Sequence, residues 1–408
     1  MDKLTEYKKI ADKAAEDNAK VYQDIALAIH AKPEVSNYEF FASETLSKQL
    51  EKEGFKIELP AAGHRTGFAA CYKSGKPGPV IVFLAEYDAL PGLGHGCGHN
   101  LFGAASALAA VALKSVIEDI GGEIRVYGTP GEEGGEEGSS KGSFVREGYF
   151  KDVDAALCVH PASGPENILS MRLLANAPVD IEFWGRPAHA AAVPEMGLNA
   201  LDAQILVFNA ISLLRQQLTT DVRIHGIITN GGEAPNVIPD YTKSKFFIRA
   251  ASMDTLNDVY AKIEKIVEGA ALQTGTKCSM KLYQNLVENM VLTPSLDALY
   301  EKNFNELGYK SEPQTLKVMP GSSDVGNVSQ ACPAIQPMIS ITDVAVPGHS
   351  QGMVEASCSE KGLAFIPLSA KVLANTAIDL ICDPELLKSI KEEHRYNVEH
   401  QKELVQGD

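Results

Sequence analysis

Hydrophobic positions in the first 176 residues alternate between helical spacing and short buried runs. Helical spacing predicts helices over the first thirty residues, over 39–53 and over 101–120, with a short one at 143–147. Compact apolar runs predict strands at 80–85 (VIVFLA), 123–127 (EIRVY) and 155–159 (AALCV). Because these strands alternate with helices, the pattern predicts an α/β fold with a mostly parallel mixed sheet flanked by helices.

The pattern changes between residues 177 and 290. There the order is strand, helix, strand, strand, helix, strand, which is typical of a ferredoxin-like α+β unit. After residue 291 the α/β pattern returns, with helices near 295–307, 360–381 and 384–403 and a strand near 334–341. We therefore expect one α/β domain, formed by 1–176 and 291–408, with an inserted domain at 177–290.

Composition excludes several classes of protein. The 408 residues are 45% hydrophobic and 22% charged, as in a folded globular protein of two or three domains. The net charge of −16 argues against nucleic acid or an anionic membrane as a partner. The most apolar run, 101–113, is shorter than the roughly 20 residues that span a bilayer, and the N-terminus lacks an apolar signal core. We expect a cytoplasmic protein with no membrane partner. Seven cysteines, an odd number, argue against a disulfide framework.

Potential metal ligands follow the ends of the predicted strands. They are Glu86, Asp88, His95, Cys97 and His99 after the first strand, Glu132 and Glu133 after the second, His160 after the third, and His349 after the strand near 334–341. In an open α/β sheet, ligands gather at the carboxyl ends of the strands. Thiolate, imidazole and carboxylate donors together suit zinc or a similar transition metal. Five of these residues are the strongest candidate ligands: Cys97, His99, Glu133, His160 and His349. Since a tetrahedral ion binds four ligands, five candidates favour a site with two ions.

Two other interpretations stay open at this point. The glycine-rich segment 92–103 has the outline of a dinucleotide site, but Cys97 or His99 occupies the last position of the GxGxxG pattern. A cysteine- or serine-based hydrolase is the other alternative, yet Ser322 and Ser323 lie in GSSDVG without a GxSxG elbow. Taken singly, each candidate ligand could also be a buried or surface residue without function.

The motifs resemble a known family. The matching segments run in the family's order over nearly the whole chain: IHAKPEVSNYEF (29–40), AEYDALPGLGHGCGHN (85–100), GTPGEEGG (128–135), CVHP (158–161), GRPAHAA (185–191), APNVIPD (234–240), GSSDVGNVS (321–329) and PGHS (347–350). The chain resembles the dinuclear-metal aminoacylase and carboxypeptidase superfamily in its cysteine-ligand amidohydrolase branch, near aminobenzoyl-glutamate hydrolase and related dipeptidases. This implies a metallopeptidase-like catalytic domain with an inserted lid and dimerisation domain, and a homodimer or higher homo-oligomer.

The resemblance also implies roles for individual residues. Cys97 would bridge two ions, and His99, Glu133, His160 and His349 would complete their coordination. Glu132 would be the general base, and Asp88 would orient a ligand without binding an ion itself. From the insert, His189 would reach the scissile carbonyl oxygen and Asn236 would assist. Arg249, on a predicted strand of the insert, could hold a substrate carboxylate. Where the branch often has a Gly-Glu-Asp-Phe-type motif, this chain has GSSDVGNVS.

The sequence therefore predicts a metal-dependent amidohydrolase with two divalent ions per subunit, zinc or manganese. Its substrate would be a small N-acyl amino acid, a dipeptide or an aminobenzoyl-glutamate-like amide, cleaved by a metal-activated water with Glu132 as the base. The alternatives are the cysteine- or serine-based hydrolase and a non-catalytic metal- or nucleotide-binding module.

Overall fold

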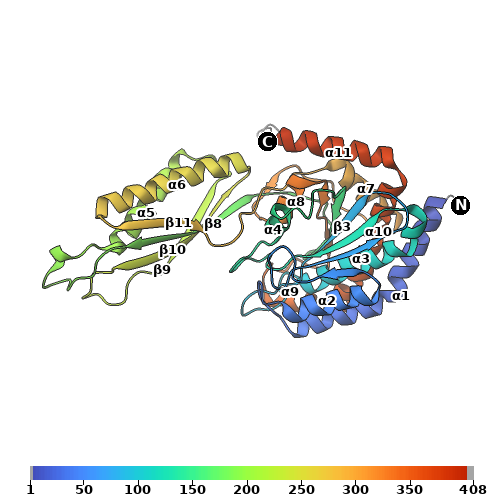
Figure 1. Cartoon of the computed structure of the whole chain (residues 1–408), viewed down its shortest axis with the longest axis horizontal. Helices are drawn as coiled ribbons and strands as arrows, with labels where there is room; N and C mark the ends of the chain where they lie inside the picture. Colours follow the sequence, from blue (N-terminus) through green and yellow to red (C-terminus); the bar gives the residue numbers. More distant parts are fainter. Residues whose placement is uncertain (1–2, 402–408) are drawn as a thin grey trace. The chain divides into compact units, whose positions relative to one another are not determined.

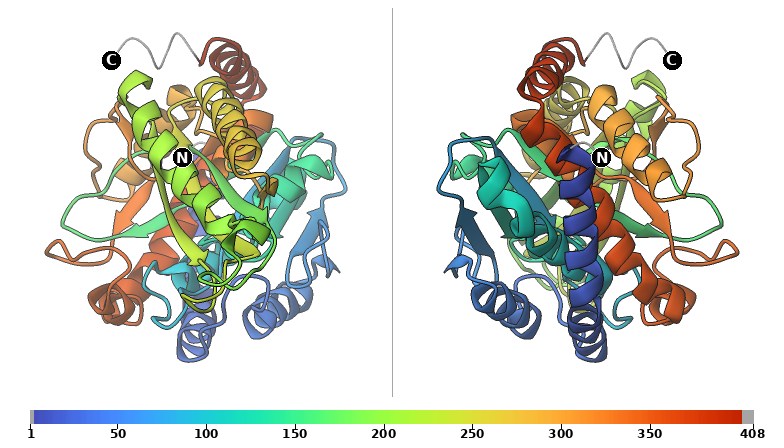
Figure 2. Two further views of the ribbon diagram at one scale, coloured as in Figure 1. Left: turned by 90° about the vertical axis from the view of Figure 1, so that its left-hand side faces the viewer. Right: turned by 90° about the vertical axis from the view of Figure 1, so that its right-hand side faces the viewer.

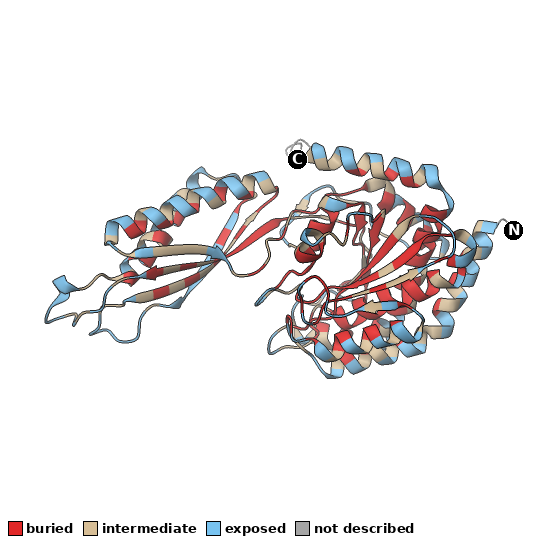
Figure 3. Cartoon of the chain, in the orientation of Figure 1, coloured by how far each residue is buried: buried red, intermediate tan, exposed pale blue. Residues whose placement is uncertain are grey.

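The chain folds into two compact units, which a computed structural model describes for residues 3–401. Unit 1 comprises Met1–Arg172, Met290–Met319 and Ser323–Asp408, and unit 2 comprises Leu173–Asn289 and Pro320–Ser322. Each unit has a buried core of its own (Figure 3). The sequence placed the insert at 177–290 and did not assign the Pro320–Ser322 segment to it. That segment joins unit 2 because Leu174 N donates a hydrogen bond to Gly321 O at 2.8 Å.

A six-stranded mixed sheet forms the centre of unit 1 (Figure 1). Its order is β1-β2-β4-β3-β5-β13, with the bounds β1 Lys56–Glu58, β2 Phe68–Lys73, β4 Glu123–Gly128, β3 Val80–Ala85, β5 Ala155–Leu157 and β13 Ala334–Ile335. The pairs β4-β3, β3-β5 and β5-β13 are parallel, whereas β1-β2 and β2-β4 are antiparallel. Strand β3 is almost wholly buried, which explains its continuous apolar sequence.

The strand predicted at 155–159 is shorter in the structure, because β5 ends at Leu157. A separate strand that was not predicted, β6 (His160–Ala162), follows it and pairs in parallel with β14 (Met338–Ser340) in a two-stranded sheet. The apolar stretch near 334–341 is divided into two strands, β13 and β14. Two further short strands are β7 (Arg172–Leu173) and β12 (Val318–Met319).

Three long helices pack against one another in unit 1, and α3 lies directly on β3 and β4 (Figure 2). They are α1 (Lys3–Ala31), α3 (His99–Ile120) and α10 (Glu360–Cys382). The remaining helices are α2 (Phe40–Lys52), α4 (Lys141–Arg146), α7 (Pro294–Glu306), α8 (Val325–Ala331), α9 (Gln351–Ala356) and α11 (Pro384–Glu399). The first helix was predicted from the start of the chain, and residues 1–2 lie outside the described residues.

The apolar run 101–113 is by itself too short to span a bilayer. The complete helices α3 and α10, however, are each long and apolar enough to cross one. In this structure 89% and 78% of their apolar windows are buried. Both helices supply side chains to the hydrophobic core of unit 1, so their apolar character is explained by packing.

Unit 2 has the chain order β-α-β-β-α-β: β8 (Ala175–Trp184), α5 (Ala200–Leu214), β9 (Arg223–Asn230), β10 (Tyr241–Ala250), α6 (Met253–Thr274) and β11 (Lys277–Leu282). Short 3₁₀ turns lie at Pro194–Met196 and Arg215–Gln217. The four strands form an antiparallel sheet in the order β11-β8-β10-β9. Alternate residues are buried along β10 and in the second half of β8, as expected for a sheet that α5 and α6 cover on one face, whereas the first five residues of β8 are all buried. Strand β9 is an edge of this sheet.

Candidate metal centre

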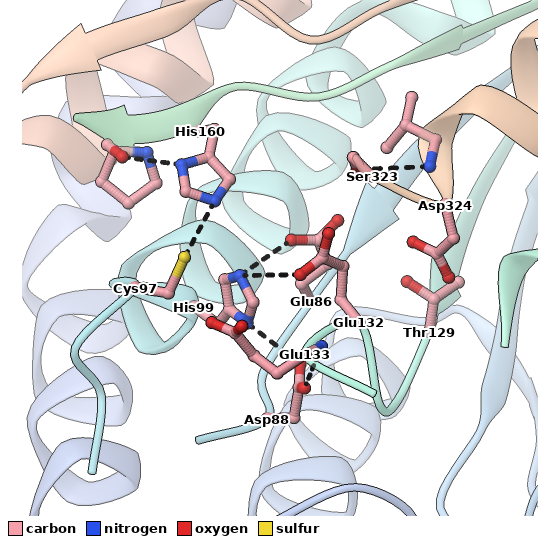
Figure 4. A network of polar contacts seen from close by, with 12 residues as sticks. Glu86, Asp88, Cys97, His99, Thr129, Glu132, Glu133, His160, Ser323 and Asp324 are labelled. Carbon is pink, nitrogen blue, oxygen red and sulfur yellow. Dashed lines mark hydrogen bonds and ion pairs between the residues drawn. The ribbon is translucent and has the colours of Figure 1, made fainter. Parts of the chain in front are cut away.

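The donor side chains come from segments that follow the parallel strands (Figure 4). Glu86 and Asp88 follow β3, His99 is the first residue of α3, and Cys97 lies in the turn just before it. Glu132 and Glu133 follow β4, His160 begins β6, and His349 precedes α9. Because β3 and β4 run in parallel, their carboxyl ends deliver these residues to one edge of the sheet.

Two glycines bring α3 close to this edge. Gly98 has φ +82°, and a Cβ on it would lie 2.6 Å from Pro161 Cγ, so only glycine fits directly before His99. A Cβ on Gly103 would lie 2.5 Å from the backbone oxygen of Glu86. Gly98 and Gly103 thus allow α3 to pack closely against the segments that follow β3 and against β6.

Two groups of donors share Cys97. One contains His99 and His160, the other Glu133 and His349, and within each group the donor atoms lie within 4.8 Å of one another. Cys97 Sγ is 3.5 Å from His160 Nε2, and His349 Nε2 is 3.4 Å from Glu133 Oε2. Two ligands at about 2.0–2.3 Å from a tetrahedral ion are themselves about 3.3–3.7 Å apart. The spacing of the donors therefore fits two ions that share one ligand.

Hydrogen bonds determine which ring nitrogen of His99 and of His160 can bind a metal ion. Asp88 Oδ1 accepts from His99 Nδ1 at 3.0 Å, and the Pro161 carbonyl accepts from His160 Nδ1 at 2.7 Å. In both rings Nδ1 thus has a hydrogen-bond partner of its own, and Nε2 is the nitrogen that faces the other donors. Burial lowers the pKa of His160 to about 4, so the ring is neutral at physiological pH, as metal binding requires.

The cluster carries an excess of negative charge. Burial raises the pKa of Cys97, of Glu133 and, together with the nearby Glu86, of Glu132. Five carboxylates lie in the ion-pair network around His99, against the ammonium of Lys141, which gives −4 when all are ionised: Glu86, Asp88, Glu132, Glu133 and Asp324. Such a buried charge is costly without compensation. Two divalent cations would neutralise it.

His349 and His95 have different surroundings. His349 is largely exposed and adopts φ +53°, an uncommon backbone conformation for a residue other than glycine and one found at functional sites. His95, also a candidate from the sequence, is buried with its ring 6.0 Å from that of His30. It is in none of the metal-capable groups found among the described residues.

Neither candidate serine has the partner that a nucleophile needs. Ser322 Oγ accepts from Arg249 at 2.8 Å, and Ser323 Oγ accepts from the backbone of Val325 at 3.3 Å. The hydrogen bonds of the described residues give neither hydroxyl a histidine base. The geometry therefore favours the metal centre over a serine nucleophile.

The insert residues lie in unit 2. His189 is exposed, and its Nδ1 accepts hydrogen bonds from the backbone of Ala191 and Ala192 at 3.3 and 3.1 Å. Nε2 must therefore carry the proton, so His189 can act as a donor. Asn236 is exposed, and its carbonyl accepts from Ala190 N at 3.0 Å. Arg249 lies on β10 and is half-buried beside Phe247.

Sequence reasoning missed a buried ion-pair network next to His99. Lys141 Nζ lies 2.8 Å from Glu86 Oε1 and 2.5 Å from Asp324 Oδ1, and all three side chains have 0% exposure. Lys141 stands in the polar segment GSSKGSF, where a lysine is ordinarily solvent-exposed. No local signal distinguishes it. Asp324 lies within GSSDVG, where the sequence analysis had considered only the serines.

Comparison with known proteins gives consistent results. A family model described as a peptidase dimerisation domain matches residues 176–275. Human Xaa-Arg dipeptidase is 34% identical, with 92% of this chain and 89% of that protein covered. One of the chains of p-aminobenzoyl-glutamate hydrolase from Escherichia coli (strain K12) is 34% identical, with 96% of this chain and 95% of that one covered. A solved dinuclear metal-binding peptidase of the M20 family from Bacillus subtilis shares the fold with a TM-score of 0.59 and 19% identity, covering 89% of this chain and 99% of that one.

Proposed function

The chain belongs to the M20 family of metal-dependent hydrolases, and from this premise we propose that it cleaves the amide bond of a small N-acyl amino acid, dipeptide or aminobenzoyl-glutamate-like substrate. Two divalent ions would be held by the two donor groups that share Cys97. The observation that carries the proposal is the agreement between the donor spacings, 3.4 and 3.5 Å, and those of ligands on a common ion.

In the proposed mechanism each residue has a separate task. Bound ions would polarise the substrate carbonyl and lower the pKa of water. Glu132 takes a proton from the attacking water as the new C–O bond forms, and then gives it to the amine as the C–N bond breaks. Asp88 accepts hydrogen bonds from His99 Nδ1 and Glu133 N, both at 3.0 Å, and so orients one ligand from each donor group.

Residues of the insert would act on the substrate. We propose that His189, through Nε2–H, donates to the carbonyl oxygen as it gains negative charge. Asn236 would assist on the same side, because its backbone pairs with the loop that carries His189. Arg249 would bind a substrate carboxylate, for which it would exchange its bond to Ser322. As a lid, unit 2 would close over bound substrate.

Metal removal tests the proposed function. Protein purified without added chelator should contain about two equivalents of transition metal, and chelation should abolish hydrolysis, because both donor groups would lose their ions. Zinc or manganese should restore it. Activity is measured on a panel of N-acyl amino acids, dipeptides with varied C-terminal residues and aminobenzoyl-glutamate.

Two outcomes would contradict the proposal. Hydrolysis that survives chelation would exclude a metal mechanism, and its loss on thiol alkylation would then indicate a cysteine nucleophile. A fully metallated protein that cleaves none of the panel would exclude the proposed substrate classes.

We further propose that unit 2 mediates a homodimer. Strand β9 presents a free sheet edge, and apolar side chains are exposed on it and on the neighbouring helix α5: Ile227 (65%), Ile228 (41%), Ile205 (48%) and Leu213 (74%). A second copy could pair its own β9 and α5 with this surface in a two-fold arrangement. The match to a peptidase dimerisation domain over residues 176–275 supports this occupant.

The double variant Leu213→Glu, Ile227→Lys should dissociate the dimer. Charges at two exposed apolar positions would be buried on association, so the dimer Kd should rise at least about 100-fold. Analytical ultracentrifugation measures it. Leu272→Glu is the matched control, because Leu272 is 86% exposed but lies on α6. An unchanged Kd for the double variant would place the interface elsewhere.

A further inference from the structure

Besides Cys97 and His160, two carboxylates lie close to His99 Nε2. Glu86 Oε2 lies 3.2 Å away and Glu132 Oε2 3.9 Å away. Figure 4 shows both carboxylates directed at this nitrogen. Glu86, His99 and Glu132 form the third metal-capable group among the described residues. The family resemblance gave Glu132 a role and gave Glu86 none.

The contact between Glu86 and His99 lies between two groups that can each bind a metal ion. Asp88 Oδ1 is the partner of His99 Nδ1 at 3.0 Å, which leaves Nε2 as the ring nitrogen that faces the Glu86 carboxylate. Both side chains have 0% exposure, and within the described residues neither Nε2 nor Oε2 has a hydrogen-bond partner. Two buried groups in this arrangement need a proton or a metal ion between them, and the donor atoms lie close enough together to hold an ion.

We propose that Glu86 is a sixth protein ligand, which binds through Oε2 the ion held by His99 Nε2. The proposal rests on the proposed function, because it assumes the dinuclear centre. The separation of 3.2 Å supports it, since two neighbouring ligands at about 2.1 Å from one ion are about 3.0 Å apart in octahedral and about 3.4 Å apart in tetrahedral geometry. Glu86 would therefore supply an oxygen to an ion that otherwise has sulfur and nitrogen donors.

Lys141 and Asp324 explain how Glu86 is held for this task. Lys141 Nζ contacts the other oxygen, Oε1, at 2.8 Å, which leaves Oε2 free to face His99. Asp324 in turn holds Lys141 at two points: its carboxylate contacts Nζ and accepts from the backbone N at 3.0 Å. Lys141 and Asp324 are thus positioning residues, and they give the GSSDVG segment a function in the ion site.

Glu86→Gln tests the assignment through metal affinity. Zn²⁺ is titrated into the metal-free variant in competition with a chelator of known affinity. We expect one of the two ions to bind at least about 10-fold more weakly and the other to be little changed, because the amide removes a charged donor from one ion only. Co²⁺-substituted protein should show an altered visible absorption spectrum, since this reports the ligand set.

The rise in melting temperature on metal binding separates ligation from a structural role. Glu86→Gln also removes a carboxylate from Lys141, so the metal-free variant should melt at a lower temperature than metal-free wild type. If Glu86 is a ligand, the rise in melting temperature at a fixed Zn²⁺ concentration should also be smaller in the variant, whereas a purely structural residue would leave that rise unchanged. Glu136→Gln is the matched control, because Glu136 is an exposed carboxylate in the acidic loop, and both its Zn²⁺ affinities should stay within about 3-fold of wild type.

The outcomes distinguish this inference from the proposed function. If wild-type protein binds two ions and hydrolyses substrate while Glu86→Gln keeps both affinities and the Co²⁺ spectrum, only the assignment of Glu86 is wrong. If wild-type protein fails to bind two ions, the proposed function fails with it. Should Glu86→Gln not fold, Glu86→Asp keeps the charge but withdraws the oxygen by one methylene. The same loss of affinity is then expected, and unchanged affinity would overturn the inference.

Discussion

Glu132→Gln is expected to lower kcat by about 10²–10⁴-fold while both metal ions stay bound. The amide keeps the size and shape of the side chain but cannot accept the proton of the attacking water. Glu132 Oε2 is 3.9 Å from His99 Nε2, so the side chain lies beside the donor groups without belonging to either of those that share Cys97. Steady-state kinetics and metal analysis of the same preparation measure the two effects.

Glu136→Gln is the matched control for this variant. Glu136 lies in the same acidic loop, but its side chain is exposed, and we expect kcat and metal content to be unchanged. Near-normal turnover in Glu132→Gln would exclude it as the general base. Loss of an ion together with turnover would instead indicate that Glu132 is a ligand.

Cys97→Ala is expected to have the largest effect on metal content. Cys97 is the one residue common to the two donor groups, so its loss removes a ligand from both ions. Affinity for each ion should fall by at least about 10–100-fold, because removing even a residue that only orients a ligand has an effect of this size. Hydrolysis should fall together with metal affinity. Chelator competition and metal analysis after gel filtration measure the change.

Two further variants check the cause of that loss. Cys158→Ala removes a buried thiol two residues before His160 and should leave metal content unchanged, because Cys158 Sγ donates to the Ile335 carbonyl and is in no donor group. Cys97→Asp should recover part of the metal binding, since a carboxylate can also bridge two ions. Full metal retention in Cys97→Ala would exclude thiolate ligation.

The elements predicted best are those with strong local patterns. The continuous apolar run of β3 and the apolar helix α3 are visible in the sequence, and so is the order of strands and helices in unit 2. Strands β1 and β2 were not predicted. β1 has only three residues, Lys56–Glu58, none of them buried, and it forms by antiparallel pairing with β2. Pairing of this kind depends on the partner strand, which a local pattern does not include.

The relatives confirm the resemblance stated from the motifs, and with it a metal-dependent hydrolase. The roles assigned to Glu132, His189, Asn236 and Arg249 stay predictions, as does the assignment of ligands to particular ions. The sequence could propose Glu132, His189 and Asn236 because each lies in a motif of fixed order. Arg249 was proposed from its place on a predicted strand of the insert. The sequence could not propose Lys141, because a lysine between small polar residues has no local feature that distinguishes a buried ion pair from a solvated one.

The sequence by itself determined the chemistry of the donors and their places at the ends of strands, because both depend on residue type and short-range order. Only the tertiary structure decided which atoms face one another. It placed Glu86 Oε2 against His99 Nε2, joined Lys141 to Asp324 across 183 positions, and assigned Pro320–Ser322 to unit 2. These contacts follow from how the sheet and helices pack. Packing brings together residues that are far apart in the chain, and the local sequence around each residue does not indicate its partner.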